Sequence, residues 1–124
     1  MNDIIFNWLK TFPGLELLQR QQVDAVPGGC GLFFRGIAVK DRKWDLLGGL
    51  RCRKELRFRI SRYGGREESA LFFLMLAAWA EENAPHLGDD QVLALEEARC
   101  VRDSDQGLSL WESELTITYT EEAL

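Results

Sequence analysis

The stretch LRCRKELRFRISR (residues 50–62) alternates apolar and charged side chains, and this alternation decides the fold. Successive side chains of a strand point to opposite faces of a sheet, so alternation predicts a half-buried β-strand. One side holds the apolar residues Leu50, Cys52, Leu56, Phe58 and Ile60, with Lys54 as the only charged residue among them. The other side holds Arg51, Arg53, Glu55, Arg57, Arg59 and Ser61. The stretch therefore predicts a strand with one apolar face and one basic face.

A helix is predicted over REESALFFLMLAAWAEEN (66–83), directly after the breaker pair Gly64-Gly65. Glu67 and Glu68 in its first turn suit the positive end of the helix dipole. The middle of this helix is apolar on every side, so we expect it to be buried on more than one face. Another helix, a long loop or a neighbouring subunit should then cover it.

The remaining segments predict a second, shorter helix and further strands. They are a helix at 3–12, a weak strand at 15–23, a strand at 31–40 with Gly36 as a bulge or turn, a polar loop at 41–49, and an antiparallel strand pair at 92–102 and 108–120 around a turn at 103–107. This order predicts an α+β fold with a mostly antiparallel small sheet. A long apolar helix and a short N-terminal helix should pack against that sheet, in a single domain over residues 1–124.

Composition narrows the class of protein. The net charge of −5 argues against nucleic acid as the main partner of the whole chain. No signal pattern is visible at the amino terminus, and the longest apolar run, residues 70–80, is too short to span a bilayer. Cys30, Cys52 and Cys100 form no CxxC pair, which favours reduced thiols in a cytoplasm. We therefore expect no membrane partner and a cytoplasmic location.

Charge is strongly separated along the chain. Residues 35–66 hold eleven basic and three acidic side chains, whereas residues 67–124 hold two basic and fourteen acidic ones. Such separation favours a contact in which a basic face of one copy meets an acidic face of the next. A contact of this heterologous kind closes into a ring when the rotation between copies permits.

The arginines of residues 51–59 and the glycine-rich turn at 27–31 each allow a different functional interpretation. The arginine face is also typical of a solvated strand or of a nucleic-acid surface, although no aromatic residue lies between the arginines to stack on bases. Cys30 in PGGCG (27–31), with His86 as a base, is the best candidate for catalysis, but no cysteine-enzyme signature surrounds it. The acidic pairs lack the spacing of a calcium loop. The sequence predicts no catalytic residues, no metal and no cofactor, and so a protein that is not an enzyme.

Five segments in order resemble a known family. They are GLFFRG (31–36), KWDLLGG (43–49), LRFRISR (56–62), SALFFLMLAAWAEENAP (69–85) and LSLWESELTITYT (108–120). Together they resemble the minor capsid or tail-completion proteins of phages and prophages, which are similar to the tail terminators of long-tailed bacteriophages. The likeness covers roughly residues 30–120.

The resemblance implies a virion structural protein. Several copies, typically six, would form a homo-oligomeric ring on the last layer of the tail tube, stop tube growth and support head–tail joining. The implied partners are the tail-tube protein and the head–tail connector proteins, first in the cytoplasm of the bacterial host and then in the virion tail. The alternative is a head–tail connector (neck) protein. The expected subunit interface places the arginine face against acidic positions of the last strand: Arg51, Arg53, Arg57, Arg59, Glu112 and Glu114.

Overall fold

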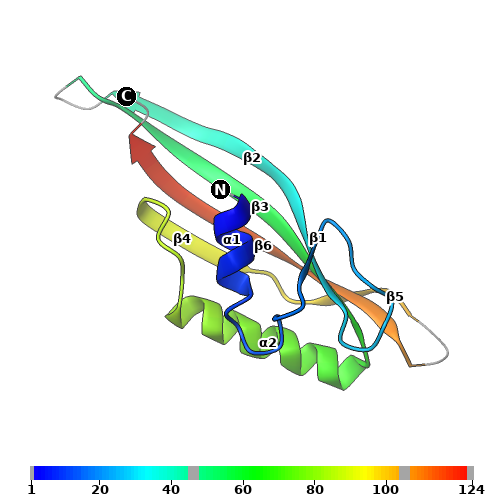
Figure 1. Ribbon diagram of the computed structural model, residues 1–124. Coiled ribbons are helices and arrows are strands. Elements are labelled where there is room, and N and C mark those ends of the chain that lie inside the picture. Colours follow the sequence, from blue (N-terminus) through cyan, green and yellow to red (C-terminus); the bar gives the residue numbers. More distant parts are fainter. Residues whose placement is uncertain (1, 45–47, 104–106, 123–124) are drawn as a thin grey trace.

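The computed structural model describes residues 2–44, 48–103 and 107–122 (Figure 1). Along the chain these residues form α1 (Asn2–Leu9), β1 (Gln19–Arg20), β2 (Cys30–Trp44), β3 (Leu50–Gly64), α2 (Arg66–Glu82), β4 (Asp89–Leu95), β5 (Arg99–Arg102) and β6 (Ser109–Glu122). The six strands make one sheet in the order β1-β2-β3-β6-β4, and β5 pairs with β6 beyond the end of β4.

The three long strands β2, β3 and β6 form the centre of the sheet. β3 pairs antiparallel with β2 on one side and with β6 on the other, along nearly its whole length. The alternation predicted for residues 50–62 is confirmed, since Leu56, Phe58 and Ile60 are buried on one face. β2 bends where its register shifts between Phe34 and Gly36, and Gly36 has a φ of 138°. The bulge predicted at Gly36 is therefore confirmed, in a backbone region that glycine tolerates.

Side chains of both helices pack against the same face of the sheet, which we call the helix face. Ile5 and Leu9 of α1 and Phe73 and Leu76 of α2 join the buried residues of β3 and β6 in one apolar cluster. The two helical segments also touch each other, because Trp8 stacks on Trp79 with their ring centroids 5.1 Å apart. Among the described residues, no helix lies on the opposite side of the sheet, which we call the open face.

The predicted α+β fold, with a mostly antiparallel small sheet and a long apolar helix, is wrong. Of the described residues 50% lie in strands and 21% in helices, and the sheet is mixed because β1 runs parallel to β2. Neither helix is a long apolar one. Residues 66–82 do form a helix, but it buries one face only, so the strands rather than the helices make up most of the core.

Several element boundaries also differ from the sequence expectations. β2 continues to Trp44 through residues expected to be a polar loop, because charged side chains on an exposed hairpin are compatible with strand pairing. The helix expected at 3–12 ends at Leu9, and the weak strand at 15–23 shrinks to Gln19–Arg20. The strand expected at 92–102 is two strands, and both pair with β6. Within the described ranges, neither helix has the length and hydropathy needed to cross a bilayer.

Candidate interface surfaces

The structure brings all six predicted interface residues to the open face of a single chain. The four arginines of β3 alternate with its buried side chains, and β6 runs beside them. In the register of this pair, Arg59 lies opposite Glu114, and Glu112 lies opposite Ser61. The basic strand and the acidic strand are therefore neighbours within the chain. The intersubunit role of these residues stays a prediction.

Glu112 is the centre of a charged cluster on the open face. Its Oε2 atom lies 3.4 Å from Nε of Arg59, and its Oε1 atom accepts a 3.0 Å hydrogen bond from Nη2 of Arg99 on β5. The side chain of Glu112 is only 11% exposed, so both cations replace water around the carboxylate. The guanidinium of Arg59 also lies 4.5 Å from the ring centre of Phe33 on β2.

The other arginines have partners within the chain as well. Nε of Arg57 lies 3.3 Å from Glu55 and 3.7 Å from Glu114. Arg51 binds Asp89 of β4 at 2.6 Å, and Arg53 donates a 3.0 Å hydrogen bond to the Thr120 hydroxyl. The sheet register thus neutralises much of the charge separation seen along the sequence.

Lys54 is the charged residue of β3 that falls among the apolar ones. It forms an ion pair with Glu121 of β6. In the register of the two strands, Glu121 lies opposite Cys52, two residues before Lys54. The hydrogen bond that Lys54 donates to Glu121 raises the pKa of Lys54, and this effect outweighs the opposing effect of burial. Lys54 is therefore held as a cation beside the carboxylate of Glu121.

Arg62 lies on the helix face, whereas Arg51, Arg53, Arg57 and Arg59 lie on the open face. It is 8% exposed, and its Nη1 donates a 2.8 Å hydrogen bond to the hydroxyl of the fully buried Ser69 on α2. Its guanidinium lies 4.8 Å from the ring centre of Phe72, and Nη2 lies 3.7 Å from Glu68. Because side chains alternate along a strand, residue 62 points to the same face as Phe58 and Ile60, and the sequence alone therefore places it on the buried side. Arg62 therefore ties the first turns of α2 to β3.

Cys30 lies at the first residue of β2 and is buried. Its thiol lies 3.5 Å from the carbonyl of Gly28, and burial raises the pKa of this thiol to about 11, against a smaller lowering effect of Arg62. An activated cysteine needs the opposite shift, toward a thiolate at neutral pH. His86, the proposed base, is exposed in the segment between α2 and β4.

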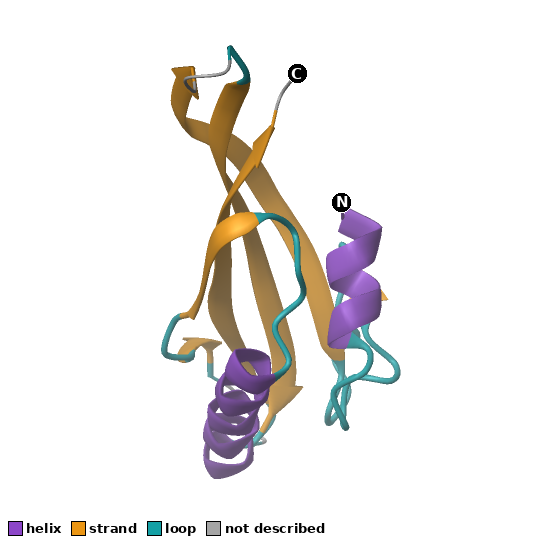
Figure 2. Ribbon diagram, turned by 90° about the vertical axis from the view of Figure 1, so that its left-hand side faces the viewer, coloured by secondary structure: helices purple, strands orange, loops and turns teal. Residues whose placement is uncertain are grey.

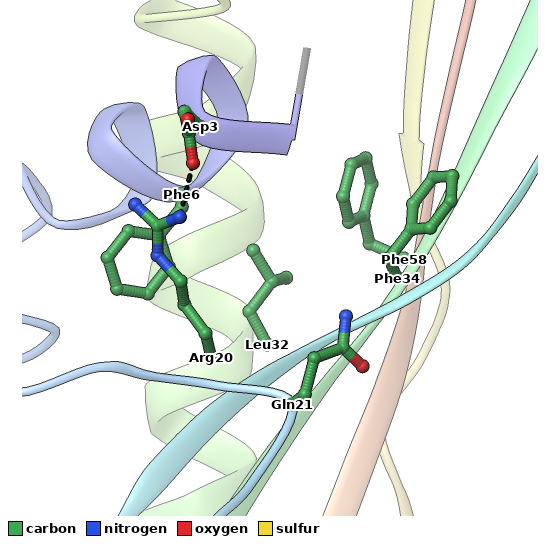
Figure 3. A pocket seen from close by; sticks show the side chains of 7 residues that line it. All are labelled: Asp3, Phe6, Arg20, Gln21, Leu32, Phe34 and Phe58. Atoms are coloured by element: carbon green, nitrogen blue, oxygen red, sulfur yellow. Dashed lines mark hydrogen bonds and ion pairs between the residues drawn. The ribbon is translucent and has the colours of Figure 1, made fainter.

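A pocket of about 570 Å³ lies between α1 and the strands β2 and β3 (Figure 3). Phe6, Phe34 and Phe58 line it with their rings, while Asp3 and Arg20 form an ion pair at its side. The guanidinium of Arg20 lies 4.2 Å from the ring centre of Phe6. The lining is mixed, since Asp3, Arg20 and Gln21 stand beside four apolar side chains, and the Asp3–Arg20 ion pair holds the titratable groups of this lining.

Two further surfaces expose large apolar side chains. On α2 the residues Leu71, Leu74 and Met75, which we call the outer helix face, are between 55% and 69% exposed. On β2 the residues 37–44, which we call the arm, expose Ile37, Val39 and Trp44 by 45% to 67%. The sequence indicated that α2 needs a cover. It did not indicate the arm, because the sequence predicts a strand that ends at residue 40 and a polar loop over 41–49.

A groove runs beside the outer helix face. It has a volume of about 440 Å³ and is lined by Ala70, Phe73, Leu74 and Ala77 of α2, by Leu95 at the end of β4 and by residues 96–98 that follow it. Glu96 and Glu97 stand at its side and are exposed. The groove is thus apolar at its base and acidic at one rim.

Within the described ranges, no group of three or more His, Cys, Asp or Glu side chains is placed to hold a metal ion. No protein-family model matches this chain, and no curated protein matches it either.

Proposed function

We propose that this protein is a structural component of a phage or prophage tail that assembles from several identical copies. The copies form a ring at the tail end, where the ring stops growth of the tail tube and supports joining to the head. The chain acts through its surfaces, and no reaction is assigned to it.

The exposed outer helix face of α2 is the observation that carries this proposal. Leu71, Leu74 and Met75 are neighbours on one side of a helix, each more than half exposed, beside an apolar groove. Contiguous apolar surface on a small domain marks a contact with another macromolecule. A protein that acts alone in solution gains nothing from such a surface.

The resemblance to tail-completion proteins supports the same proposal. Its segments fall on the elements that build the centre of the domain: 31–36 on β2, 56–62 on β3, 69–85 mainly on α2 and 108–120 mainly on β6. These are the three long strands and the helix that carries the exposed apolar face. The resemblance therefore spans the scaffold and its contact surface together.

Nucleic-acid binding is less well supported. Arg51, Arg57 and Arg59 form ion pairs with carboxylates of the same chain, and each pair weakens the attraction for a phosphate backbone. A neck protein of the head–tail junction remains the alternative within the same class. It would use a similar ring and differ in the partner that the ring contacts.

The test is the composition and shape of phage particles from the bacterium that encodes the chain. After prophage induction, mass spectrometry of purified tails should detect the chain. Deletion of its gene should give tails of uneven length that do not join heads. Detection only in heads, with tails of normal length after deletion, would favour the neck protein. Absence of the chain from purified particles would refute a virion role.

A further inference from the structure

The arm and the outer helix face lie at opposite ends of the domain. β3 runs from the arm end at Leu50 to Gly64, and α2 begins directly after it at Arg66, at the far end of the sheet. Figure 1 and Figure 2 both show the β2–β3 hairpin extending away from α2. Within one chain, the arm therefore cannot cover the outer helix face. The arm of one copy can, however, cover the outer helix face of another copy.

Resting on the proposed self-assembly, we propose that the arm of one copy occupies the groove beside α2 in the next copy. Ile37 and Val39 share the helix face of the sheet, because they lie opposite Leu56 and Lys54 in the register of β3. Their side chains project from the sheet beyond the buried core and are about half exposed. They supply the apolar part of the contact, against Leu74 and the alanines that line the groove.

Charge complementarity identifies the occupant as a second copy. The arm carries Lys40, Arg42 and Lys43 against one acidic residue, Asp41, and all four are exposed; Lys40 lies 3.7 Å from Glu55 and Lys43 lies 3.6 Å from Asp41, which leaves the arm with an excess of positive charge. The lining of the groove is acidic, because its described residues include the exposed Glu96 and Glu97 and no basic side chain; the exposed Arg99, which follows Ala98, is paired with Glu112. The basic arm and the acidic groove therefore attract each other, whereas two arms, or two grooves, repel each other through their like charges.

The edge of β2 supports the same contact. β1 pairs with β2 only at Gly31 and Leu32, and among the described residues no strand follows β2 on that side from residue 33 to residue 44. An open edge with exposed Ile37, Val39 and Trp44 is a liability unless a partner covers it. Docking in the groove of a neighbour removes these side chains from water.

The contact is heterologous, since it joins two different surfaces, and repetition of it builds a ring or a filament. The test uses two variants that each disable one surface. The arm variant is Ile37→Glu/Val39→Glu, and the groove variant is Leu71→Glu/Leu74→Glu. Leu17, which is 89% exposed and lies outside both surfaces, gives the matched control Leu17→Glu. Far-ultraviolet circular dichroism and thermal unfolding confirm that each variant is folded.

Light scattering after size exclusion should show an assembly for the unmodified chain and for Leu17→Glu, and single chains for each double variant. An equimolar mixture of the two double variants should form a dimer and nothing larger, because each such pair keeps one intact arm and one intact groove. Assembly by either folded double variant alone, or a mixture that stays monomeric, would overturn the inference. So would a monomeric unmodified chain.

A charge exchange gives a second measurement. The variant Arg42→Glu/Lys43→Glu should lose its assembly, and adding Glu96→Lys/Glu97→Lys in the same chain should restore it. Failure to restore the assembly in a folded quadruple variant would refute the proposed pairing of arm and groove. Detection of the chain in purified tails is independent of these results, so the virion role and the arm contact can fail separately.

Discussion

Arg59 of β3 and Glu112 of β6 form an ion pair across the sheet, with Nε and Oε2 3.4 Å apart, and Arg99 of β5 binds the other oxygen of the same carboxylate. One acidic side chain thus joins three strands on the open face. The cluster shows how residues from the basic and acidic halves of the sequence come together in one chain.

Reversal of one charge in this cluster should destabilise the fold. We expect Arg59→Glu to lower the free energy of unfolding by about 2 kcal/mol, because it places a second carboxylate beside the nearly buried Glu112. Urea denaturation at low protein concentration measures this change. The exposed Arg66 supplies the control Arg66→Glu, for which we expect a change within about 0.5 kcal/mol.

Charge reversal also tests whether the arginine face stabilises the fold of one chain or the contact between two chains. If Arg57→Glu/Arg59→Glu abolishes assembly and leaves the stability of the monomer unchanged, the arginine face is a subunit interface. If it lowers the stability of the monomer, the pairs with Glu112 and Glu114 act within the fold, as the distances favour.

Removal of the buried hydrogen bond between Arg62 and Ser69 should loosen α2. We expect Ser69→Ala to cost about 1–3 kcal/mol, because it leaves a buried guanidinium N–H without its 2.8 Å acceptor. The double variant Arg62→Met/Ser69→Ala should cost less than the sum of the two single changes, since the pair is then removed together. Strict additivity in urea denaturation would show that the two side chains are not coupled.

Gly31 should not tolerate any side chain. A Cβ atom at this position would lie 2.1 Å from the carbonyl oxygen of Gln22, which is backbone and cannot move aside easily. We expect Gly31→Ala to cost about 3 kcal/mol or more. Gly65 is the comparison, because a Cβ there meets nothing within 4 Å and the residue caps α2 without a side-chain hydrogen bond. Gly65→Ser should keep or raise the melting temperature.

Cys30 should react slowly with iodoacetamide in the folded protein. Burial raises the pKa of its thiol from 9.0 to about 11, so the alkylation rate should keep rising tenfold per pH unit above pH 9 instead of levelling off. Mass spectrometry of peptides gives the rate at Cys30, and the chain unfolded in urea is the control. Rapid alkylation of Cys30 at pH 7 in the folded chain would contradict the raised pKa.

The same shift predicts the direction of stability with pH. The unfolded thiol loses its proton near pH 9, whereas the folded thiol holds it until about pH 11. Because the unfolded state then binds fewer protons, the free energy of unfolding should fall between these two pH values. Replacement of Cys30 by alanine should make this fall smaller but not abolish it, because the pKa values of Lys54 and Tyr119 are also raised in the folded chain.

The sequence by itself determined what depends on nearest neighbours along the chain. The alternation at residues 50–62 predicted β3 and its buried side, the breaker at Gly64-Gly65 fixed the start of α2, and Gly36 indicated the bulge in β2. These features follow from periodicity and backbone conformation, which act over a few residues.

Only the tertiary structure decided which surfaces meet. The sheet register placed Glu112 beside Arg59, turned Arg62 toward Ser69 and extended β2 into an exposed arm. It also left one side of α2 uncovered, although the composition of the helix predicted burial on more than one face. Contacts between distant residues depend on strand order and register, and local sequence patterns do not specify either of them.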